Sequence, residues 1–429
     1  MRYLLAILIN VIAWGNPASS ASMDEEVAMA LPLVEEAYKF LHEHPELGKQ
    51  ETQAQLYLTS KFRALGFTRF ETSPSAPTAV IAVLETGRPG PVVALRAEMD
   101  ARPLEAGKDE PEDHQPRSLI AGRMHNCGHD VHAAMLLGAA SVLKRNADRL
   151  VGTVVFVFQP AEETPGGADD LIRDGVLQRL GVQKIFAQHV APGLPVGTVA
   201  ISPGVVLAAS GYFKIMLKGS GSHAAEPWRG SDVGLLATHL AQELAYLPAR
   251  RLDPVSRPAI ISIARLVADG GASNQLPSEA ELSGTVRAFE DLETANQDRV
   301  SLSELMRSTV ERFAAAHQVT ATWAFRTGSP PTENSRALFD ETIKPLSSVW
   351  TTGLNTTLSR GMFSEDFAFY TRHNQALYFA LGVAGDSLGR AGVHTREFTI
   401  DPGTLRIGTR LMTHLGVIGS TGQARFHSE

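Results

Sequence analysis

The stretch MHNCGHDVHAAM, residues 124–135, contains three histidines, an aspartate and the only cysteine of the chain, Cys127. Thiolate, imidazole and carboxylate groups together suit a divalent transition metal such as Zn, Co, Ni or Mn, rather than Mg or Ca. Each residue alone has a simpler interpretation. Cys127 is then a small buried hydrophobic residue, and Asp130 is the N-cap of a helix that begins near it.

Further side chains able to bind or orient a metal follow predicted strands. The segments PVVALRAEMD, TVVFVFQPAEE and KIFAQH end in acidic residues or a histidine, and the loop after ALYFALGVA contains another histidine. Ligands bind outside the carboxyl ends of the strands in open α/β sheets, so we expect these side chains to converge with the first stretch. The converging residues are Glu98, Asp100, Cys127, His129, Glu162, Glu163, His189 and His394.

The adjacent residues Glu162 and Glu163 suit two different tasks. A carboxylate that coordinates a metal cannot also take up a proton freely, so one glutamate binds metal and the other acts as a general base. A bound metal lowers the pKa of its water from about 15.7 to about 7, and a second metal about 4 Å away stabilises a developing oxyanion. These features predict hydrolysis of an amide or related acyl bond. Asp100 then orients a ligand histidine by accepting its far ring N–H.

The elements that position these residues are those of an α/β protein. Residues 24–67 have apolar positions at helical spacing, interrupted by Pro45 and Gly48, and beyond them strands alternate with helices. Such alternation predicts a largely parallel sheet. Residues 210–320 differ, with two helices among several strands, which predicts a small inserted α+β domain. We therefore expect a catalytic α/β domain over residues 24–209 and 321–429, interrupted by that domain.

The composition points to a small substrate. The 429 residues are 44% hydrophobic and 20% charged, as in globular proteins, and the net charge is −7. This charge gives no basic surface for nucleic acid, so a small molecule or a peptide is the expected partner.

The first residues, 1–21, have the pattern of a secretory signal peptide: a positive start, an apolar run and a small-residue end. The apolar run is shorter than the roughly 20 residues that a membrane span needs, so we expect no membrane span in the mature chain. We expect export to the periplasm or the medium. One cysteine cannot form an intrachain disulfide, and a lone thiol in an oxidising compartment is a liability unless something occupies it.

Motifs in matching order over nearly the whole mature chain, residues 41–394, resemble those of the amidohydrolase branch of the aminoacylase and carboxypeptidase G metallopeptidases. This branch includes hippurate hydrolases and auxin-conjugate (indoleacetyl-amino-acid) hydrolases. The motifs are LHEHPELGKQE, LRAEMDARPLEA, MHNCGHDVHAAMLLGAA, FQPAEETPGGA, QHVAPGLPVGTV, GSGSHAAEP, GGASNQLPSEAELSGTVRAF and SEDFAFY.

The resemblance implies an N-acyl-amino acid or dipeptide substrate and two divalent metal ions per chain. It implies that Cys127 bridges them, with the remaining ligands His129, Glu163, His189 and His394, and that Glu162 is the general base. It also implies that the inserted domain is ferredoxin-like, acts as a lid and forms a homodimer.

In that dimer, His223 would polarise the scissile carbonyl in the neighbouring subunit, while Asn274 and Arg287 would hold the substrate. Arg287 suits a carboxylate through its bidentate guanidinium. From the sequence alone, His223 is an ordinary turn residue and Arg287 a surface cation. Glu98 stands where the branch has aspartate, which leaves the metal ligands intact but puts substrate preference in doubt.

Two alternatives remain open at this point. GDSLG, around Ser387, matches the nucleophile elbow of serine hydrolases, although no helix is expected directly after it. The chain could also be an exported metal- or solute-binding protein without catalysis. Glu162 separates this alternative from an enzyme, because a binding protein has no use for an unliganded second carboxylate beside the metal.

Overall fold

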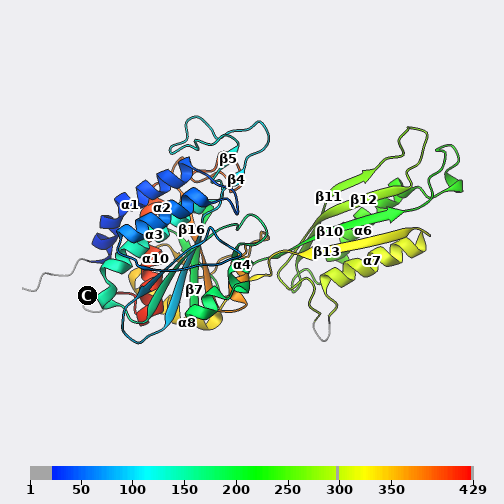
Figure 1. Cartoon of the computed structure of the whole chain (residues 1–429). Coiled ribbons are helices and arrows are strands. Elements are labelled where there is room, and N and C mark those ends of the chain that lie inside the picture. The colour runs from blue at the N-terminus through cyan, green and yellow to red at the C-terminus, as the bar shows by residue number, and fades with distance from the viewer. Residues whose placement is uncertain (1–21, 296–298, 427–429) are drawn as a thin grey trace, which may run out of the picture.

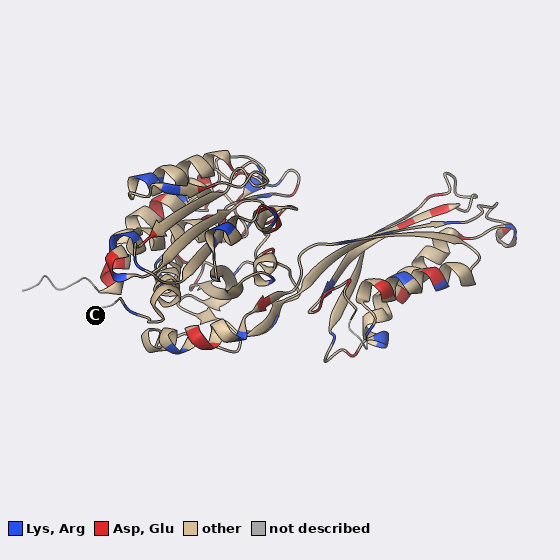
Figure 2. Ribbon diagram, turned by 60° about the horizontal axis from the view of Figure 1, so that its bottom comes forward, with Lys and Arg blue, Asp and Glu red and all other residues tan. Residues whose placement is uncertain are grey.

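The computed structural model describes residues 22–295 and 299–426, and the predicted signal peptide lies outside them. The chain forms two bodies joined by thin connections, the larger containing both ends of the described chain (Figure 1). Acidic and basic residues are interspersed along the ribbon of both bodies (Figure 2). None of the helices in the described ranges combines the length and apolar character required to cross a membrane.

The larger body contains the predicted α/β sheet. Its strand order is β1-β2-β6-β3-β7-β16-β8-β15, and β6, β3, β7 and β16 run parallel to one another. Antiparallel pairing occurs toward the edges, between β1 and β2, β2 and β6, and β16 and β8. In spatial order the strands are β1 (Arg69–Glu71), β2 (Val80–Glu85), β6 (Thr153–Gln159), β3 (Val92–Glu98), β7 (Lys184–Pro195), β16 (Gln375–Ala384), β8 (Val199–Ala200) and β15 (Leu354–Asn355).

Both faces of this sheet are covered, which explains the continuous apolar runs of its strands. In β3, Val93 and Leu95 belong to the core under one helical layer, whereas Ala94 faces the opposite core. The first layer contains α1 (Met23–Glu43), α2 (Thr52–Ala64), α3 (His129–Arg145), α8 (Arg336–Val349) and α10 (Gly403–Thr421). The second contains α4 (Gly167–Arg173), α5 (Val176–Leu180) and α9 (Ala368–Thr371).

The smaller body is a four-stranded antiparallel sheet with two helices and its own apolar core. Its strand order is β11-β12-β10-β13. The predicted boundary after residue 320 is too early, because β13 pairs along its whole length with β10 of this sheet. The elements are β10 (Ala209–Lys218), η2 (Pro227–Arg229), α6 (Val233–Arg251), β11 (Ala259–Ala268), β12 (Glu279–Ala288), α7 (Leu302–Ala316) and β13 (Thr320–Thr327).

Short elements connect and complete the larger body. A two-stranded pair, β9 with β14, lies where the chain enters and leaves the smaller body, and β4 with β5 forms a hairpin before α3. Their bounds are β4 (Arg102–Pro103), β5 (Arg123–Met124), η1 (Ala147–Arg149), β9 (Gly204–Leu207) and β14 (Thr332–Asn334).

Candidate metal centre

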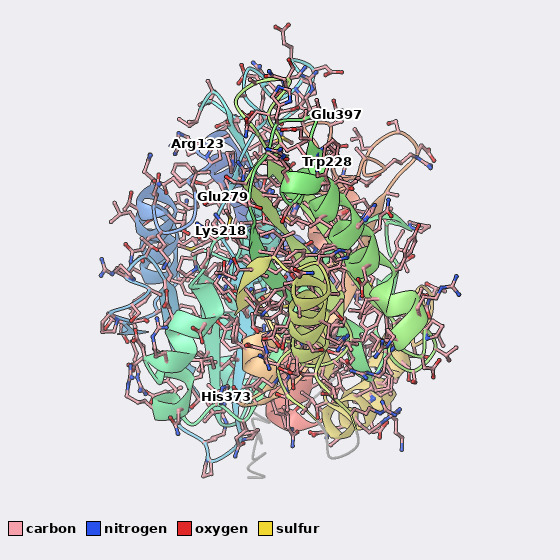
Figure 3. All side chains as sticks on the ribbon, turned by 90° about the vertical axis from the view of Figure 1, so that its right-hand side faces the viewer. Arg123, Lys218, Trp228, Glu279, His373 and Glu397 are labelled. Carbon is pink, nitrogen blue, oxygen red and sulfur yellow. The ribbon has the colours of Figure 1, made fainter. Side chains whose placement is uncertain are left out.

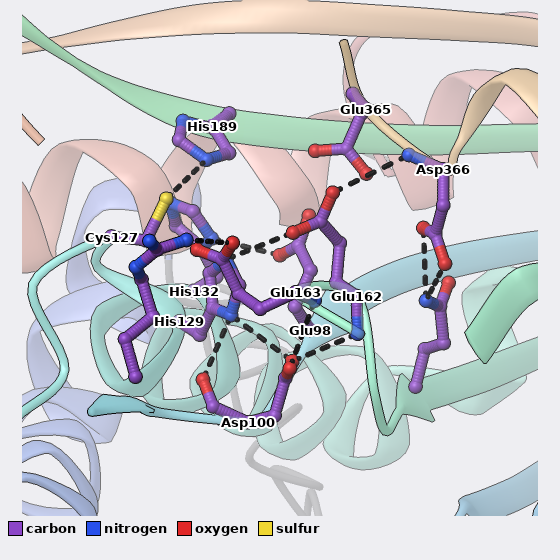
Figure 4. A network of polar contacts seen from close by, with 12 residues as sticks. Glu98, Asp100, Cys127, His129, His132, Glu162, Glu163, His189, Glu365 and Asp366 are labelled. Carbon is purple, nitrogen blue, oxygen red and sulfur yellow. Dashed lines mark hydrogen bonds and ion pairs between the residues drawn. The ribbon is translucent and has the colours of Figure 1, made fainter. Parts of the chain in front are cut away.

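The turn into α3 places Cys127 and His129 at the edge of the sheet. Gly128 precedes the helix with φ 83°, a left-handed conformation that glycine adopts without steric cost. A side chain at this position would also collide with Val190, since a Cβ would lie 2.6 Å from Val190 Cγ2. Gly128 therefore allows the loop to approach β7 closely, and Cys127 Sγ lies 3.5 Å from His189 Nε2 (Figure 4).

The hydrogen bonds of His129 and His189 fix which ring nitrogen is free. Nδ1 of His129 contacts the Asp100 carbonyl oxygen at 2.9 Å, and Nδ1 of His189 contacts the Val190 carbonyl oxygen at 2.8 Å. A carbonyl only accepts hydrogen bonds, so both Nδ1 atoms donate. Nε2 of each ring then presents a lone pair, and Nε2 of His129 is buried without a hydrogen-bond partner. This is the usual arrangement of a metal-binding histidine.

Asp100 organises the two glutamates as well as His129. Its Oδ1 accepts from the Glu162 N–H at 3.1 Å and lies 3.2 Å from His129 Nδ1, while its Oδ2 accepts from the Glu163 N–H at 3.0 Å. Ala161, directly before the glutamates, has φ 56°, which costs energy for a non-glycine residue and turns the chain sharply after β6. The glutamates lie in this loop rather than at a helix start, because α4 begins only at Gly167.

The side chains of Glu162 and Glu163 point to different partners. Glu163 Oε1 lies 3.0 Å from His394 Nε2, and its Oε2 accepts from Arg102 Nη1. Although burial acts in the opposite direction, the hydrogen bond to His394 and the nearby positive charges lower the pKa of Glu163. Glu162 Oε2 lies 4.0 Å from His129 Nε2. The pKa of Glu162 is raised, first by burial and then by the charges of Glu365 and Asp366.

A buried charged cluster that the sequence did not predict lies under Glu162. Arg96, fully buried in β3, donates to Glu98, to Glu365 at 2.9 Å and to Asp366 at 2.7 Å. The Asp366 N–H in turn contacts Glu162 Oε1 at 3.4 Å. The sequence signal was a charged residue within the apolar run VVALRAE, because a buried arginine needs acidic partners.

Other polar side chains nearby already hydrogen-bond to groups of the protein. His132 donates from Nδ1 to Glu98 at 2.8 Å and accepts at Nε2 from the Val190 N–H at 2.9 Å, so it has no lone pair left for a metal. Asp366 accepts from the Gln159 side chain and from the Ala168 N–H. These groups therefore support the site and do not bind metal.

The remaining donors fit divalent metal ions. Cys127, His129 and His189 have ligand atoms within 4.8 Å of one another, and so do Cys127, Glu163 and His394. Burial raises the pKa of the Cys127 thiol to about 12, so a cation is needed to hold it as a thiolate at neutral pH. All five predicted ligands are therefore brought together. His189 lies within β7 rather than at its end, because β16 pairs alongside it as far as Ala384.

Of the three residues expected to act on the substrate, only Arg287 lies next to this centre. Its Nη1 donates to the Ser364 hydroxyl at 2.6 Å, one residue before Glu365. His223 and Asn274 are exposed and lie together, with Asn274 Nδ2 3.5 Å from His223 Nε2. His223 lies in the loop after β10 and Asn274 in the loop between β11 and β12, at the end of the smaller sheet that is remote from the larger body, near Lys218, which Figure 3 shows in the foreground.

Asp130 is not the helix cap that was expected, because Gly128 occupies the N-cap position of α3. Its Oδ2 instead pairs with His42 Nδ1 of α1 at 2.6 Å, and His42 Nε2 pairs with Glu110 at 2.9 Å. Burial would lower the pKa of His42, but these two hydrogen bonds outweigh burial and raise the pKa to about 10.

Ser387 lies in a loop after β16, and the next helix, α10, begins only at Gly403. A nucleophile elbow requires a helix directly after the serine. The serine hydrolase alternative is therefore not supported.

Comparison with known proteins finds matches over most of the chain. The family described as peptidase family M20/M25/M40 matches residues 94–416. Thermostable carboxypeptidase 2 of Saccharolobus solfataricus is 34% identical over 372 residues, covering 86% of this chain and 90% of that protein. IAA-amino acid hydrolase ILR1-like 2 of Arabidopsis thaliana is 33% identical over 378 residues, covering 88% and 83%.

A solved structure is similar over almost the same length. The YXEP protein of Bacillus subtilis, described as a dinuclear metal binding peptidase, superposes with a TM-score of 0.74 at 29% identity. The match covers 92% of this chain and 99% of that one.

Proposed function

Because this chain belongs to peptidase family M20/M25/M40 and is therefore a metal-dependent hydrolase of amide bonds, we propose that it cleaves N-acyl-amino acids or dipeptides. The observation that carries this proposal is the division between the two glutamates. Glu163 faces His394 among the ligand atoms, whereas Glu162 has an oxygen, Oε2, directed toward the same centre. A protein that only binds metal would not need this second carboxylate.

We propose two divalent ions per chain, with Cys127 between them. The support is that the two ligand groups, one with His129 and His189 and one with Glu163 and His394, share this single thiol. Zn, Mn, Co and Ni are all compatible with such a mixed donor set. Metal at this site supplies Lewis-acid activation of a water molecule and of the scissile carbonyl.

Glu162 moves the proton in the proposed mechanism. Its Oε2 takes a proton from the attacking water, and the same oxygen then gives that proton to the leaving amide nitrogen. The raised pKa of Glu162 suits the second transfer. A carboxyl group of ordinary pKa is deprotonated near neutral pH and would hold the proton too briefly to deliver it. Asp100 keeps the carboxyl group in place by accepting from the Glu162 N–H.

We further propose that His223 acts in the metal centre of a second copy of this chain. Its position at the remote end of the smaller sheet, together with Asn274, keeps it away from the metal centre of its own chain. The exposed edge strand β11 offers a surface for a homodimer, with Ile260, Leu266 and Val267 partly exposed. His223 would donate to the carbonyl oxygen of the bound substrate.

Arg287 is the proposed partner of the substrate carboxylate. It is half-buried at the end of β12 that adjoins the larger body, and within the described part of the chain its guanidinium hydrogen-bonds only to a neutral hydroxyl, that of Ser364. A carboxylate is a stronger acceptor for a guanidinium than a hydroxyl is. Substrate binding would therefore replace the Ser364 contact.

A hydrolysis screen tests the chemistry. Protein reconstituted with Zn, Mn, Co or Ni is assayed against N-acetyl-amino acids, N-benzoyl-amino acids and dipeptides, with elemental analysis of the same samples. We expect turnover that chelation abolishes and metal restores. Full metal occupancy without turnover of any substrate in these classes would favour a binding protein and contradict the proposal.

Mixing two inactive variants tests the shared site. His223→Ala and Glu162→Gln each impair a different residue, so a hybrid dimer contains one complete site if His223 acts in the other subunit. Random exchange of subunits should restore about a quarter of the wild-type rate. A mixture that stays as inactive as its components, with exchange verified by mass spectrometry, would show that His223 does not act across a dimer.

Export to the periplasm or the medium is also a proposal, supported by the leader pattern of residues 1–21. Fractionation of cells expressing the full chain, with mass determination of the mature N-terminus, tests it. A chain that retains residue 1 in the cytoplasm would contradict it.

A further inference from the structure

The segment formed by residues 360–364 joins the two bodies beside the metal centre. Ser364 accepts from Arg287 of β12 at 2.6 Å, and the guanidinium of Arg360 lies 4.5 Å from the ring centroid of Phe289, just after the same strand. The residues that follow Ser364 belong to the buried cluster, since Asp366 contacts Glu162. The segment therefore adjoins both the general base and the proposed carboxylate site.

Phe363, the residue next to Ser364, is 62% exposed although it is a large apolar side chain. Its position is nevertheless defined. The ring lies against the backbone of Gly361, where a Cβ would be 2.5 Å from Phe363 Cε1. The carbonyl oxygens of Gly361 and Phe363 both accept from the Ala208 N–H at 3.1 Å, and the Gly361 N–H donates to Val206 at 2.8 Å. Phe363 is thus an aromatic ring on a backbone anchored to β9 and the residue after it.

We propose that Phe363 determines specificity by contacting the side chain of the substrate's amino acid, and that this side chain is apolar. The inference rests on the proposed function, in which Arg287 binds the substrate carboxylate. The carboxylate and the side chain leave the same carbon atom of an amino acid. A wall for the side chain must therefore lie close to the carboxylate site, and Phe363 is adjacent in sequence to the residue that Arg287 contacts.

The chemistry of this wall favours aliphatic and aromatic amino acids over small or acidic ones. An aromatic ring offers apolar area and no hydrogen-bonding group, so it gains contact with leucine or phenylalanine side chains and desolvates a carboxylate without compensation. Differences of one or more methylene groups in such a pocket change kcat/KM by about 10-fold to 200-fold.

The experiment compares two substrate series in the metal-loaded full-length protein. In the first series the acyl group is acetyl and the amino acid is glycine, alanine, leucine, phenylalanine or aspartate. In the second the amino acid is leucine and the acyl group is acetyl or benzoyl. Wild type, Phe363→Ala and Phe363→Leu are compared with Leu56→Ala, which truncates an exposed apolar side chain on α2, away from the site.

We expect wild type to prefer N-acetyl-leucine and N-acetyl-phenylalanine to N-acetyl-glycine by at least about 10-fold in kcat/KM. Phe363→Ala should reduce this ratio at least fivefold, mainly through KM, while the acetyl to benzoyl ratio stays within twofold. Phe363→Leu should retain most of the preference, and Leu56→Ala all of it.

Three results would overturn the inference. The first is a wild-type enzyme that prefers glycine or aspartate. The second is an unchanged leucine to glycine ratio in Phe363→Ala. The third is an equal loss on all substrates, which would place Phe363 in the packing of the two bodies instead. Because each of these requires a wild-type enzyme that turns substrate over, they differ from failure of the proposed function, where wild type hydrolyses nothing.

Discussion

Replacing Glu162 by glutamine removes the proposed general base while changing the shape of the side chain very little. The amide oxygen can still accept from the Asp366 N–H, as Glu162 Oε1 does at 3.4 Å. The backbone contact of residue 162 with Asp100 does not depend on the side chain. None of the five proposed metal ligands is altered, so the variant should fold and bind metal as wild type does.

The expected loss of activity follows from the proton transfers that an amide cannot perform. General acid–base catalysis contributes about 10²-fold to 10⁴-fold to a rate, and each tenfold step is about 1.4 kcal/mol of activation free energy. Glu162→Gln should therefore raise the activation free energy by about 3 to 5.5 kcal/mol, which lowers kcat by about 10²-fold to 10⁴-fold, with a much smaller change in KM. The variant should be no less stable, because it removes one of several acids buried together with Glu365 and Asp366.

The assay measures kcat and KM on the best substrate of the screen, with metal content determined on the same samples. Glu163→Gln is the matched control, since the same chemical change one residue away removes a proposed ligand and should lower metal content. Glu162→Gln protein with full metal content and a kcat within tenfold of wild type would refute the assignment of the base.

Cys127→Ala is expected to lose metal at the paired site, and two ions per chain at full occupancy in that variant would disprove the bridging role. Arg102 donates to Glu163, so Arg102→Leu should weaken Co(II) binding about 10-fold. Arg123→Leu, on the adjacent strand, is the control. Equal Kd values for Co(II) in the two variants would contradict the argument. Chelation should lower the melting temperature, and metal at about 100 times its Kd should raise the free energy of unfolding by about 2.7 kcal/mol. A melting temperature that does not change with metal would contradict this. Because the pKa of His42 is raised to about 10, its protonated ring, paired with Asp130 and Glu110, stabilises the fold fully below pH 6.5. This contribution to the free energy of unfolding disappears as the pH rises to about 10. The difference in free energy of unfolding between wild type and His42→Gln should shrink across that range in urea titrations, and a constant difference would argue against an ion pair.

The proposed ligands could be selected from the sequence because their signals are local. Cys127 and His129 lie two residues apart, and the glutamates come shortly after an apolar strand. Convergence then follows from the parallel order of β6, β3, β7 and β16, which places the ends of strands far apart in sequence at one edge. The helices over residues 24–67 were also predictable from periodicity, and α1 and α2 occupy that range.

The parts that could not be predicted depend on pairing over long sequence distances. Arg96 contacts Glu365 and Asp366, which are 269 and 270 residues away in the chain, and no periodicity reports such a contact. The end of the inserted domain was misplaced for the same reason. The run Thr320–Thr327 is a strand in either domain, and only its register with β10 assigns it to the smaller sheet.

The charges around the centre explain why metal and protein structure should depend on each other. Among the described residues, six carboxyl groups gather there, and the guanidinium groups of Arg96 and Arg102 hydrogen-bond to four of them. The carboxyl groups are those of Glu98, Asp100, Glu162, Glu163, Glu365 and Asp366. Burying several carboxyl groups together costs free energy, and the pKa values of Glu162 and Asp366 are raised accordingly. Divalent ions held by Cys127 and Glu163 would offset part of that cost. Glu98 accepts hydrogen bonds on both oxygens, from Arg96 on one and from His132 on the other. A shorter acid would not easily reach both partners. Glu98, at which the sequence departs from the resembling branch, therefore links Arg96 of the charged cluster to His132, beside the proposed metal ligands.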